Sequence, residues 1–281
     1  MSVINTNVSA LYSQNAMKIN SRAMSTAMEQ LSTGSRINSA KDDAAGLAIG
    51  QSMTSQIRGL NQAVRNANDG INMLQTAEGA LVEQSNMLQR MRELAVQSSN
   101  GTYSDDQRGY LHTEFSALTS QIDSIASQTT WNGTTLLTGT NTNSVSGTAG
   151  DMQFQVGQAS GQLISITISS MSINASGLAI SGLSISAAAD AQDALATIDD
   201  ALDTINNQRA TIGAGINRLT YAADNMTNIA SNVTASRSSI MDTDYAQAST
   251  QLSKTQIIQQ ASTAMLAQAN QQPQSVLALL K

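Results

Sequence analysis

The stretch LATIDDALDTINNQRATIGAGINRLTYAADNMTNIASNVTASRSSI, residues 195–240, decides the architecture, because nearly every helical turn in it carries an apolar side chain on one face. At alternating spacings of three and four residues, the stripe reads Leu195, Ile198, Leu202, Ile205, Arg209, Ile212, Ile216, Leu219, Ala223, Met226, Ala230, Val233, Arg237 and Ile240. This spacing is typical of a coiled-coil helix. Such a helix would span roughly 70 Å, so we expect it to lie against other long helices.

The composition favours long helices over a rounded core. Aromatic residues make up 3% of the chain, and the only proline is Pro273, so uninterrupted helices are permitted almost everywhere. The net charge of −6 argues against nucleic acid as a partner, and the absence of cysteine excludes disulfides and cysteine metal sites. We find neither a secretory signal nor an apolar run of membrane-spanning length, so we expect no membrane insertion.

The two ends of the chain carry marginal helical stripes rich in Ala, Ser and Gln. The first covers residues 8–31, and Gly34 should end it in the left-handed conformation. The last covers residues 245–265, before Pro273 interrupts the helix. Neither stripe has enough apolar surface to be stable alone in water. We therefore expect the two ends to pair with each other, and to be disordered in the monomer and ordered on assembly.

Longer helices are expected in the inner parts of the chain, at about residues 43–99, 104–129 and 190–240. Asp42 and Asp43 suit the N-terminus of the first, because negative charge there is stabilising. Its apolar seam repeats every seven residues, at Met53, Leu60, Ala67, Leu74, Leu81, Leu88 and Ala95. Ser104 and Gln107 form the pattern of a capping box at the start of the next helix. The short link between these helices predicts an antiparallel pair.

Between residues 131 and 189 the chain is rich in Gly, Ser and Thr, and it predicts β-hairpins that cap the helices. Asn132-Gly133 is a strong turn signal, and the alternating segments 153–156 and 163–168 predict strands. Loops are expected at residues 139–150 and 169–189. The fold class is therefore mainly α: a rod of long antiparallel coiled-coil helices, formed by pairing N- and C-terminal segments, with small β-hairpins in the middle of the chain.

No arrangement of residues indicates catalysis. His112 is the only histidine, and it has neither the spacing of a metal ligand nor a nucleophile beside it. Adjacent carboxylates occur at residues 42–43, 105–106 and 199–200, where capping and solvation explain them. We expect no enzyme, no metal and no cofactor.

One polar face stands out on the helix predicted at 43–99. Gln89, Arg90, Glu93 and Gln97 lie away from the apolar seam, and Glu114 on the next, antiparallel helix could reach this face. The simplest interpretation is a solvated helix flank with pairs three or four residues apart.

Several motifs resemble those of bacterial flagellins closely. They are INTNVSAL at 4–11, QLSTGSRIN at 30–38, KDDAAGLA at 41–48, NANDGI at 66–71, TAEGAL at 76–81, QTTWNG at 128–133 and the tail at 270–280. The resemblance covers both ends of the chain and thins in the middle. Flagellins often carry large outer domains there, so this chain resembles a short member with little or no outer variable domain.

The resemblance implies a structural subunit that self-assembles into the helical filament of the bacterial flagellum, which serves swimming motility. The chain would be exported unfolded by the flagellar type III system and secreted to the extracellular filament. Residues 1–42 and 241–281 would form the inner filament core, and residues 43–240 an outer rod domain. The expected polymer-interface residues are Val8, Leu11, Ile19, Leu31, Leu252, Ile258, Met265, Leu277 and Leu280.

The same resemblance implies further partners. They are other copies of the chain, a flagellar export chaperone at the C-terminal region, and the filament cap and hook-junction proteins. The polar face is similar to the surface that vertebrate Toll-like receptor 5 reads in the family members it recognises, with Arg90, Leu94 and Glu114 matching in type and position. The expected receptor-recognition residues are Gln89, Arg90, Glu93, Leu94, Gln97 and Glu114.

Three alternatives stay open at this point. A hook–filament junction protein shares similar ends, although it usually departs more from the tail motifs. A chemoreceptor-like coiled-coil signalling hairpin also uses Ala-, Gln- and Ser-rich heptads, but it would need a membrane segment and a helical tip. An enzyme built on a flagellin scaffold would need catalytic residues in the middle of the chain.

Overall fold

The computed structural model describes residues 6–139 and 150–278, with side chains up to Gln271. Its elements are α1 (Val8–Thr33), α2 (Ala44–Ser99), α3 (Asp105–Gln128), β1 (Thr130–Trp131), β2 (Thr134–Thr135), β3 (Asp151–Gln155), β4 (Leu163–Thr167), α4 (Ala188–Met241) and α5 (Tyr245–Ala278). The predicted mainly α fold, with paired chain ends and small β-hairpins in the middle, is confirmed. None of the described helices combines the length and the apolarity needed to cross a bilayer.

The chain divides into two compact units. Unit 1 comprises Met1–Ile57 and Ser231–Lys281, and unit 2 comprises Arg58–Ala230. The division falls within α2 and α4, so each long helix contributes to both units. The domain boundaries expected near residues 42 and 241 stay a prediction.

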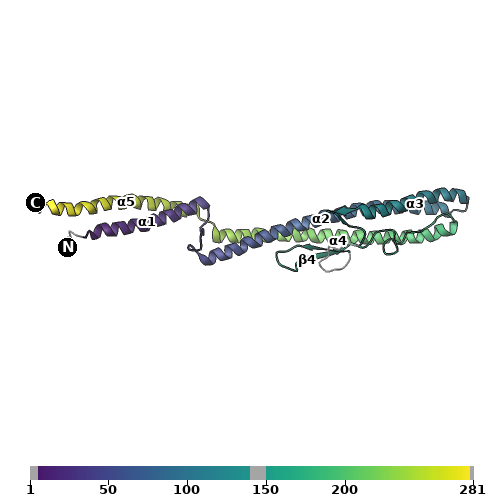
Figure 1. The fold of residues 1–281 in the computed structure, drawn as a ribbon, viewed down its shortest axis with the longest axis horizontal. Helices are drawn as coiled ribbons and strands as arrows, with labels where there is room; N and C mark the ends of the chain where they lie inside the picture. Colours follow the sequence, from purple (N-terminus) through teal and green to yellow (C-terminus); the bar gives the residue numbers. More distant parts are fainter. Residues whose placement is uncertain (1–5, 140–149, 279–281) are drawn as a thin grey trace. The chain divides into compact units, whose positions relative to one another are not determined.

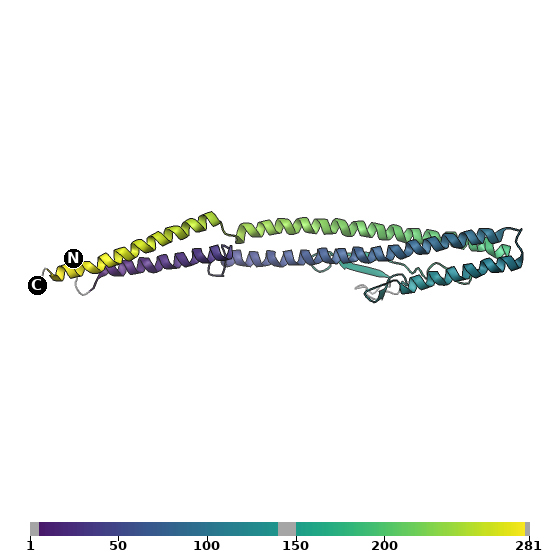
Figure 2. The same ribbon diagram turned by 90° about the horizontal axis from the view of Figure 1, so that it is seen from above.

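Unit 1 is built on α1 and α5, which lie side by side and antiparallel, with the N- and C-termini at the same end (Figures 1 and 2). Gly34 ends α1 in the predicted left-handed conformation, with φ 70° and its N–H donating to the carbonyl of Gln30. The links that follow α1 and precede α5 then pair as an isolated antiparallel bridge between Ser35 and Asp242. The N–H of Arg36 donates to the carbonyl of Met241 at 2.7 Å on one side of this bridge.

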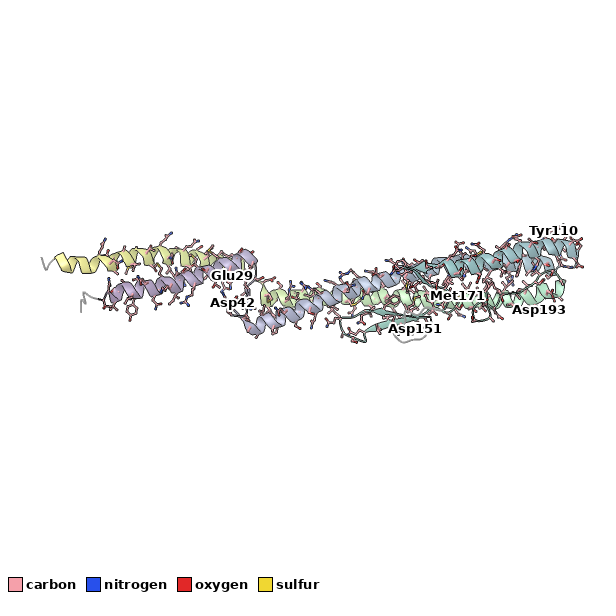
Figure 3. The ribbon with its side chains drawn as sticks, viewed as in Figure 1. Glu29, Asp42, Tyr110, Asp151, Met171 and Asp193 are labelled. Carbon is pink, nitrogen blue, oxygen red and sulfur yellow. The ribbon has the colours of Figure 1, made fainter. Side chains whose placement is uncertain are left out.

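The link between α1 and α2 is held by its two aspartates. The Asp43 carboxylate accepts from the N–H of Gly46 at 2.9 Å and so caps α2, as predicted. Asp42 lies one residue earlier (Figure 3) and accepts from the backbone N–H groups of Asn38 and Ser39. The hydroxyl of Ser39 also donates to it, and this bond is the main cause that lowers the pKa of Asp42 below its ordinary value.

The interruption expected at Pro273 is wrong, because α5 continues through this residue to Ala278. A proline removes one N–H donor from the helix and crowds the preceding turn. A long helix can tolerate that loss near its end, because the turns on either side keep their own hydrogen bonds.

Unit 2 contains α3 and the larger parts of α2 and α4 (Figure 1). Their buried side chains form a continuous apolar core. The seven-residue seam predicted on α2 is buried from Leu60 to Ala95. The predicted capping box of α3 is present, with the Ser104 and Gln107 side chains each bonded to the other's backbone N–H. The end of the α2–α3 hairpin is held by Arg108, which donates to the carbonyls of Ser98 and Asn100.

The seam predicted on α4 is half right. The residues that repeat every seven positions as predicted are fully or nearly fully buried: Ile198, Ile205, Ile212, Leu219 and Met226. Of their expected companions, Ala223 and Ala230 are buried, but Leu195, Leu202, Arg209 and Ile216 are only half-buried. The neighbouring Ala194, Ala201, Gln208 and Gly215 are buried in place of these four. The reason is a second layer on that side: the Gln208 amide bonds to the backbone of Thr167 and Ser169, and Ile166 covers Gly215.

The β-hairpins lie along the helices and do not cap them. The β1–β2 turn is Asn132-Gly133, with φ 48° and 80°, as the sequence predicts for a primed turn. A Cβ on Gly70 would come within 2.8 Å of Phe154, and one on Gly215 within 2.6 Å of Ile166. These glycines therefore let the β3–β4 hairpin approach α2 and α4 closely. The loop expected at 139–150 lies almost wholly outside the described residues.

Candidate assembly and recognition surfaces

The contact between α1 and α5 buries only small or polar side chains. In the described part of the two helices, the buried residues are Ala10, Asn20 and Ala27 on α1 and Ala248, Thr255 and Ala269 on α5. Most of the large apolar side chains in this part of the helices are exposed and the others are half-buried, so the pair fully covers only a narrow strip of each helix. An exposed apolar surface of this kind marks an interaction site.

Most of the predicted polymer-interface residues belong to this exposed surface. Val8, Leu11, Ile19, Ile258 and Met265 are exposed, from 38% for Ile258 to 62% for Met265. Leu31 and Leu252 are half-buried. Leu277 and Leu280 were also predicted, but their side chains lie outside the described residues.

Sequence reasoning missed several members of the same surface. Tyr12, Met28, Tyr245 and Ile257 are all more than half exposed, and Ile257 reaches 66%. The prediction took about one apolar residue per turn, whereas a helix with one narrow contact leaves the rest of its surface free. The adjacent pair Ile257-Ile258 could have signalled this, because neighbours on a helix point about 100° apart.

A shallow hollow of about 350 Å³ lies within unit 1, between α1 and α5. Tyr12 and Ala16 line it from α1, and Ile258, Ala261 and Met265 line it from α5. Ser13 and Ser262 complete this lining, which is mostly apolar and could therefore accommodate an apolar side chain of another molecule.

The polar face predicted on α2 and α3 is organised by Arg90. The guanidinium donates to Glu93 at 2.9 Å on the same helix and to Glu114 at 3.0 Å on α3. These two hydrogen bonds, Glu93 first, raise the pKa of Arg90 above its ordinary value. All three side chains are about half exposed or more. The arrangement holds a cation and two carboxylates in fixed positions at the surface.

The rest of the predicted recognition set divides between surface and core. Gln89 and Gln97 are exposed, and the Gln97 amide donates to the Tyr103 hydroxyl at 3.0 Å. Leu94 is 1% exposed. This burial in the core of unit 2 does not fit a surface contact, so a role of Leu94 in recognition stays a prediction.

A hollow of about 460 Å³ lies beside Arg90 on the same helix face, lined by Gln89, Arg92, Glu93 and Val96. Arg92 of this lining is fixed by Asp199 of α4, whose carboxylate accepts from the arginine Nε at 2.7 Å. Val96 is 48% exposed and supplies the only large apolar side chain of this lining. The face therefore combines charge, amide groups and one apolar contact. Within residues 6–139 and 150–278, no cluster of His, Asp and Glu has the composition of a metal site.

Comparisons with known proteins agree with the helical ends and the motifs. The family model of the bacterial flagellin N-terminal helical region matches residues 4–142, and that of the C-terminal helical region matches residues 195–280. The chain belongs to the bacterial flagellin family. This flagellin contains the two family regions and a short connection between them. The family is one of structural proteins, so the chain is not an enzyme.

Curated relatives span the same length as this flagellin. The flagellin of Halalkalibacterium halodurans is 44% identical over 279 residues, covering 99% of this chain and 100% of that one. The flagellar filament 31.3 kDa core protein of Treponema maltophilum is 44% identical over 288 residues, with the same coverage. A solved structure titled as a putative flagellar hook-associated protein from Vibrio parahaemolyticus is 19% identical with a TM-score of 0.61, covering 72% of this chain and 100% of that one. That likeness concerns the fold alone.

Proposed function

We propose that this flagellin, a structural subunit that self-assembles into the bacterial flagellar filament, makes its main filament contacts through α1 and α5. The observation that carries the proposal is the exposed apolar surface of these two helices, which the pairing within one chain leaves uncovered. When each copy binds the next through two different surfaces, two copies do not form a closed dimer. Such head-to-tail contacts produce a helical polymer.

The terminal helices order only on assembly in this proposal. Alanines supply the buried apolar contacts between α1 and α5, and each buries little apolar surface. Ordering the residues of two such helices has a conformational entropy cost of about 1–2 kcal/mol per residue. Contacts with neighbouring copies would supply the missing apolar burial.

Electron microscopy of full-length and truncated chains tests the assembly proposal. The full chain, seeded or salted out, should give long filaments, and a chain without residues 1–40 and 245–281 should give none. Circular dichroism of the truncated chain is the control, since unit 2 holds the main apolar core and should stay helical. Filaments formed by the truncated chain would contradict the assignment of the contacts to α1 and α5.

The polar face around Arg90 is proposed as the surface that Toll-like receptor 5 reads. A fixed cation between Glu93 and Glu114, beside a hollow with one exposed valine, supports this proposal. Arg90→Ala should weaken receptor signalling by tenfold or more, because charged hydrogen bonds contribute about 1.5–3 kcal/mol. Arg65→Ala is the matched control, since this exposed arginine lies on the same helix outside the face. Signalling left unchanged by Arg90→Ala would contradict the assignment.

Export and the remaining partners are also proposals. The chain would leave the cell unfolded through the flagellar type III system, with an export chaperone on the C-terminal region that includes α5. The filament cap and the hook-junction proteins would contact the same terminal helices at the two ends of the filament. The large exposed apolar side chains of α5 support the proposal of a chaperone, because an apolar surface of this kind would otherwise aggregate before assembly.

A further inference from the structure

The α1–α5 pair has an apolar contact that carries little information about register. The buried apolar side chains of its described part are alanines: Ala10, Ala27, Ala248 and Ala269. One alanine presents nearly the same surface as another, so sliding one helix along the other by a heptad changes this packing little. Something other than apolar packing must select one register.

In the described part of the pair, hydrogen bonds join α1, or the Asn7 residue that caps it, to α5 at three levels. Near the links, the Tyr245 hydroxyl donates to the carbonyl of Leu31 at 3.3 Å. In the middle, the Asn20 amide donates to the carbonyl of Thr255 at 2.8 Å. At the far end, the Asn7 amide donates to the carbonyl of Ala269 at 2.7 Å.

Asn20 is the most discriminating of these residues, because it is buried at the contact. It is 7% exposed and faces Thr255, which is 2% exposed. Its amide nitrogen also lies 3.2 Å from the Gln259 side-chain oxygen, so one –NH₂ group serves two acceptors on α5. A buried amide left without such partners is unfavourable.

A shift by one heptad removes one of these acceptors. Every register offers backbone carbonyls, but the side-chain acceptor at Gln259 is particular to this one. Sliding α5 by seven residues in either direction brings Leu252 or Leu266 to the place of Gln259. Leucine accepts no hydrogen bond, so the second N–H of Asn20 would be buried against an apolar side chain.

We infer that Asn20, through Thr255 and Gln259, sets the register in which the two terminal helices pair. The pair then presents one fixed arrangement of Tyr12, Ile258 and Met265 on its outside. Every copy thus offers the same surface. The inference concerns pairing inside one chain, and it would hold whichever contacts the copies make.

The absence of cysteine allows a direct test by engineered cross-links. Ala27→Cys with Ala248→Cys reports the native register, and Ala27→Cys with Thr255→Cys reports a shift of one heptad. Each variant is mixed as a minor fraction with the cysteine-free chain and polymerised, so that cysteines of different copies lie apart. After mild oxidation, cross-linked chains are measured by their mobility on a non-reducing gel. The native pair should exceed the shifted pair.

Asn20→Leu, added to both cysteine pairs, is the decisive variant. It should raise the ratio of shifted to native cross-links roughly tenfold, as expected for the loss of two ordinary hydrogen bonds. Asn15→Leu is the matched control, because Asn15 is exposed on the same helix, and it should leave the ratio unchanged. If Asn20→Leu does not enter filaments, Asn20→Ala gives the same comparison.

Two results would overturn the inference. An unchanged ratio in the Asn20 variants would mean that the bridge between Ser35 and Asp242 fixes the register alone. Equal cross-linking of native and shifted pairs with Asn20 in place would mean that no single register is selected. Failure of all chains to polymerise would instead count against the assembly proposal, including its claim that the terminal helices order only on assembly. The ratio would then be read on the soluble chain.

Discussion

Unit 2 and the α1–α5 pair of unit 1 are both built from long antiparallel helices, but they bury different side chains. The core of unit 2 contains Leu74, Leu88, Phe115 and Ile198, all 1% exposed or less. In the described part of α1 and α5 the buried apolar residues are alanines, and most of the large apolar side chains are exposed. The difference teaches that helical length alone does not make a stable unit. Unit 2 buries its large apolar side chains within a single chain, whereas the α1–α5 pair is half of an interface in the function we propose.

An isoleucine-to-alanine substitution should therefore lower the stability of the folded chain much more in unit 2 than in α5. This difference is the largest effect that we expect. Ile198→Ala removes a fully buried side chain from the core of unit 2 and should lower the free energy of unfolding by about 2–5 kcal/mol. Ile257→Ala, on α5, removes a side chain that is 66% exposed and should change it by no more than about 0.5 kcal/mol. Chemical denaturation followed by circular dichroism measures both.

In polymerisation, unlike in unfolding, Ile257→Ala should be the more harmful of the two variants. Ile257→Ala should raise the critical concentration for filament growth, while folded Ile198→Ala should polymerise normally below its unfolding temperature. Light scattering during seeded growth gives both values. A large loss of stability in Ile257→Ala monomers would show that α5 is already packed before assembly and would remove the contrast.

The sequence predicted the helices well, because capping and period are local properties. Gly34 ends α1 and the Ser104 capping box begins α3, both as predicted. The seven-residue repeat that includes Ile198 is buried along α4, also as predicted. The companion stripe through Leu202 failed for a nonlocal reason. A spacing of three and four assumes one partner helix, whereas the β3–β4 hairpin covers Gly215 from another side.

The candidate surfaces were less predictable than the fold. Arg90 and Glu114 could be brought together by the antiparallel hairpin alone, since charge and helix face are visible in the sequence. Leu94 could not be assigned to surface or core in this way, because it adjoins the seam, and its burial depends on how α3 packs. Ile257 was missed for the opposite reason, since a weakly amphipathic helix does not show which face its partner covers.

A polar contact of unit 2 offers the next largest effect. The Arg108 guanidinium is nearly buried and donates to the carbonyls of Ser98 and Asn100 and to the Asp105 carboxylate. Arg108→Ala leaves the buried Ser98 carbonyl without this donor and should lower the free energy of unfolding by about 1–3 kcal/mol. Arg108→Lys should recover only part of the lost free energy of unfolding, because an ammonium group cannot donate in the fixed planar geometry of a guanidinium. Full recovery in the lysine variant would mean that charge alone matters.

The smallest effect belongs to unit 1 and depends on pH. Asp42 has a pKa lowered below its ordinary value of 3.8, chiefly by the Ser39 hydroxyl, and its side chain holds the link before α2. A carboxyl whose pKa is lower in the folded state stabilises above its unfolded pKa, and this contribution disappears as the pH falls through the folded pKa. Amide exchange of residues 36–43, corrected for intrinsic rates, should therefore accelerate on acidification below about pH 4. Asp42→Asn keeps an acceptor oxygen but cannot titrate, so its protection should be lower at neutral pH and change less with acid. Equal pH dependence in both chains would mean that the Ser35–Asp242 bridge, and not Asp42, holds this link. The part of unit 1 outside the α1–α5 pair would then be stabilised by backbone pairing.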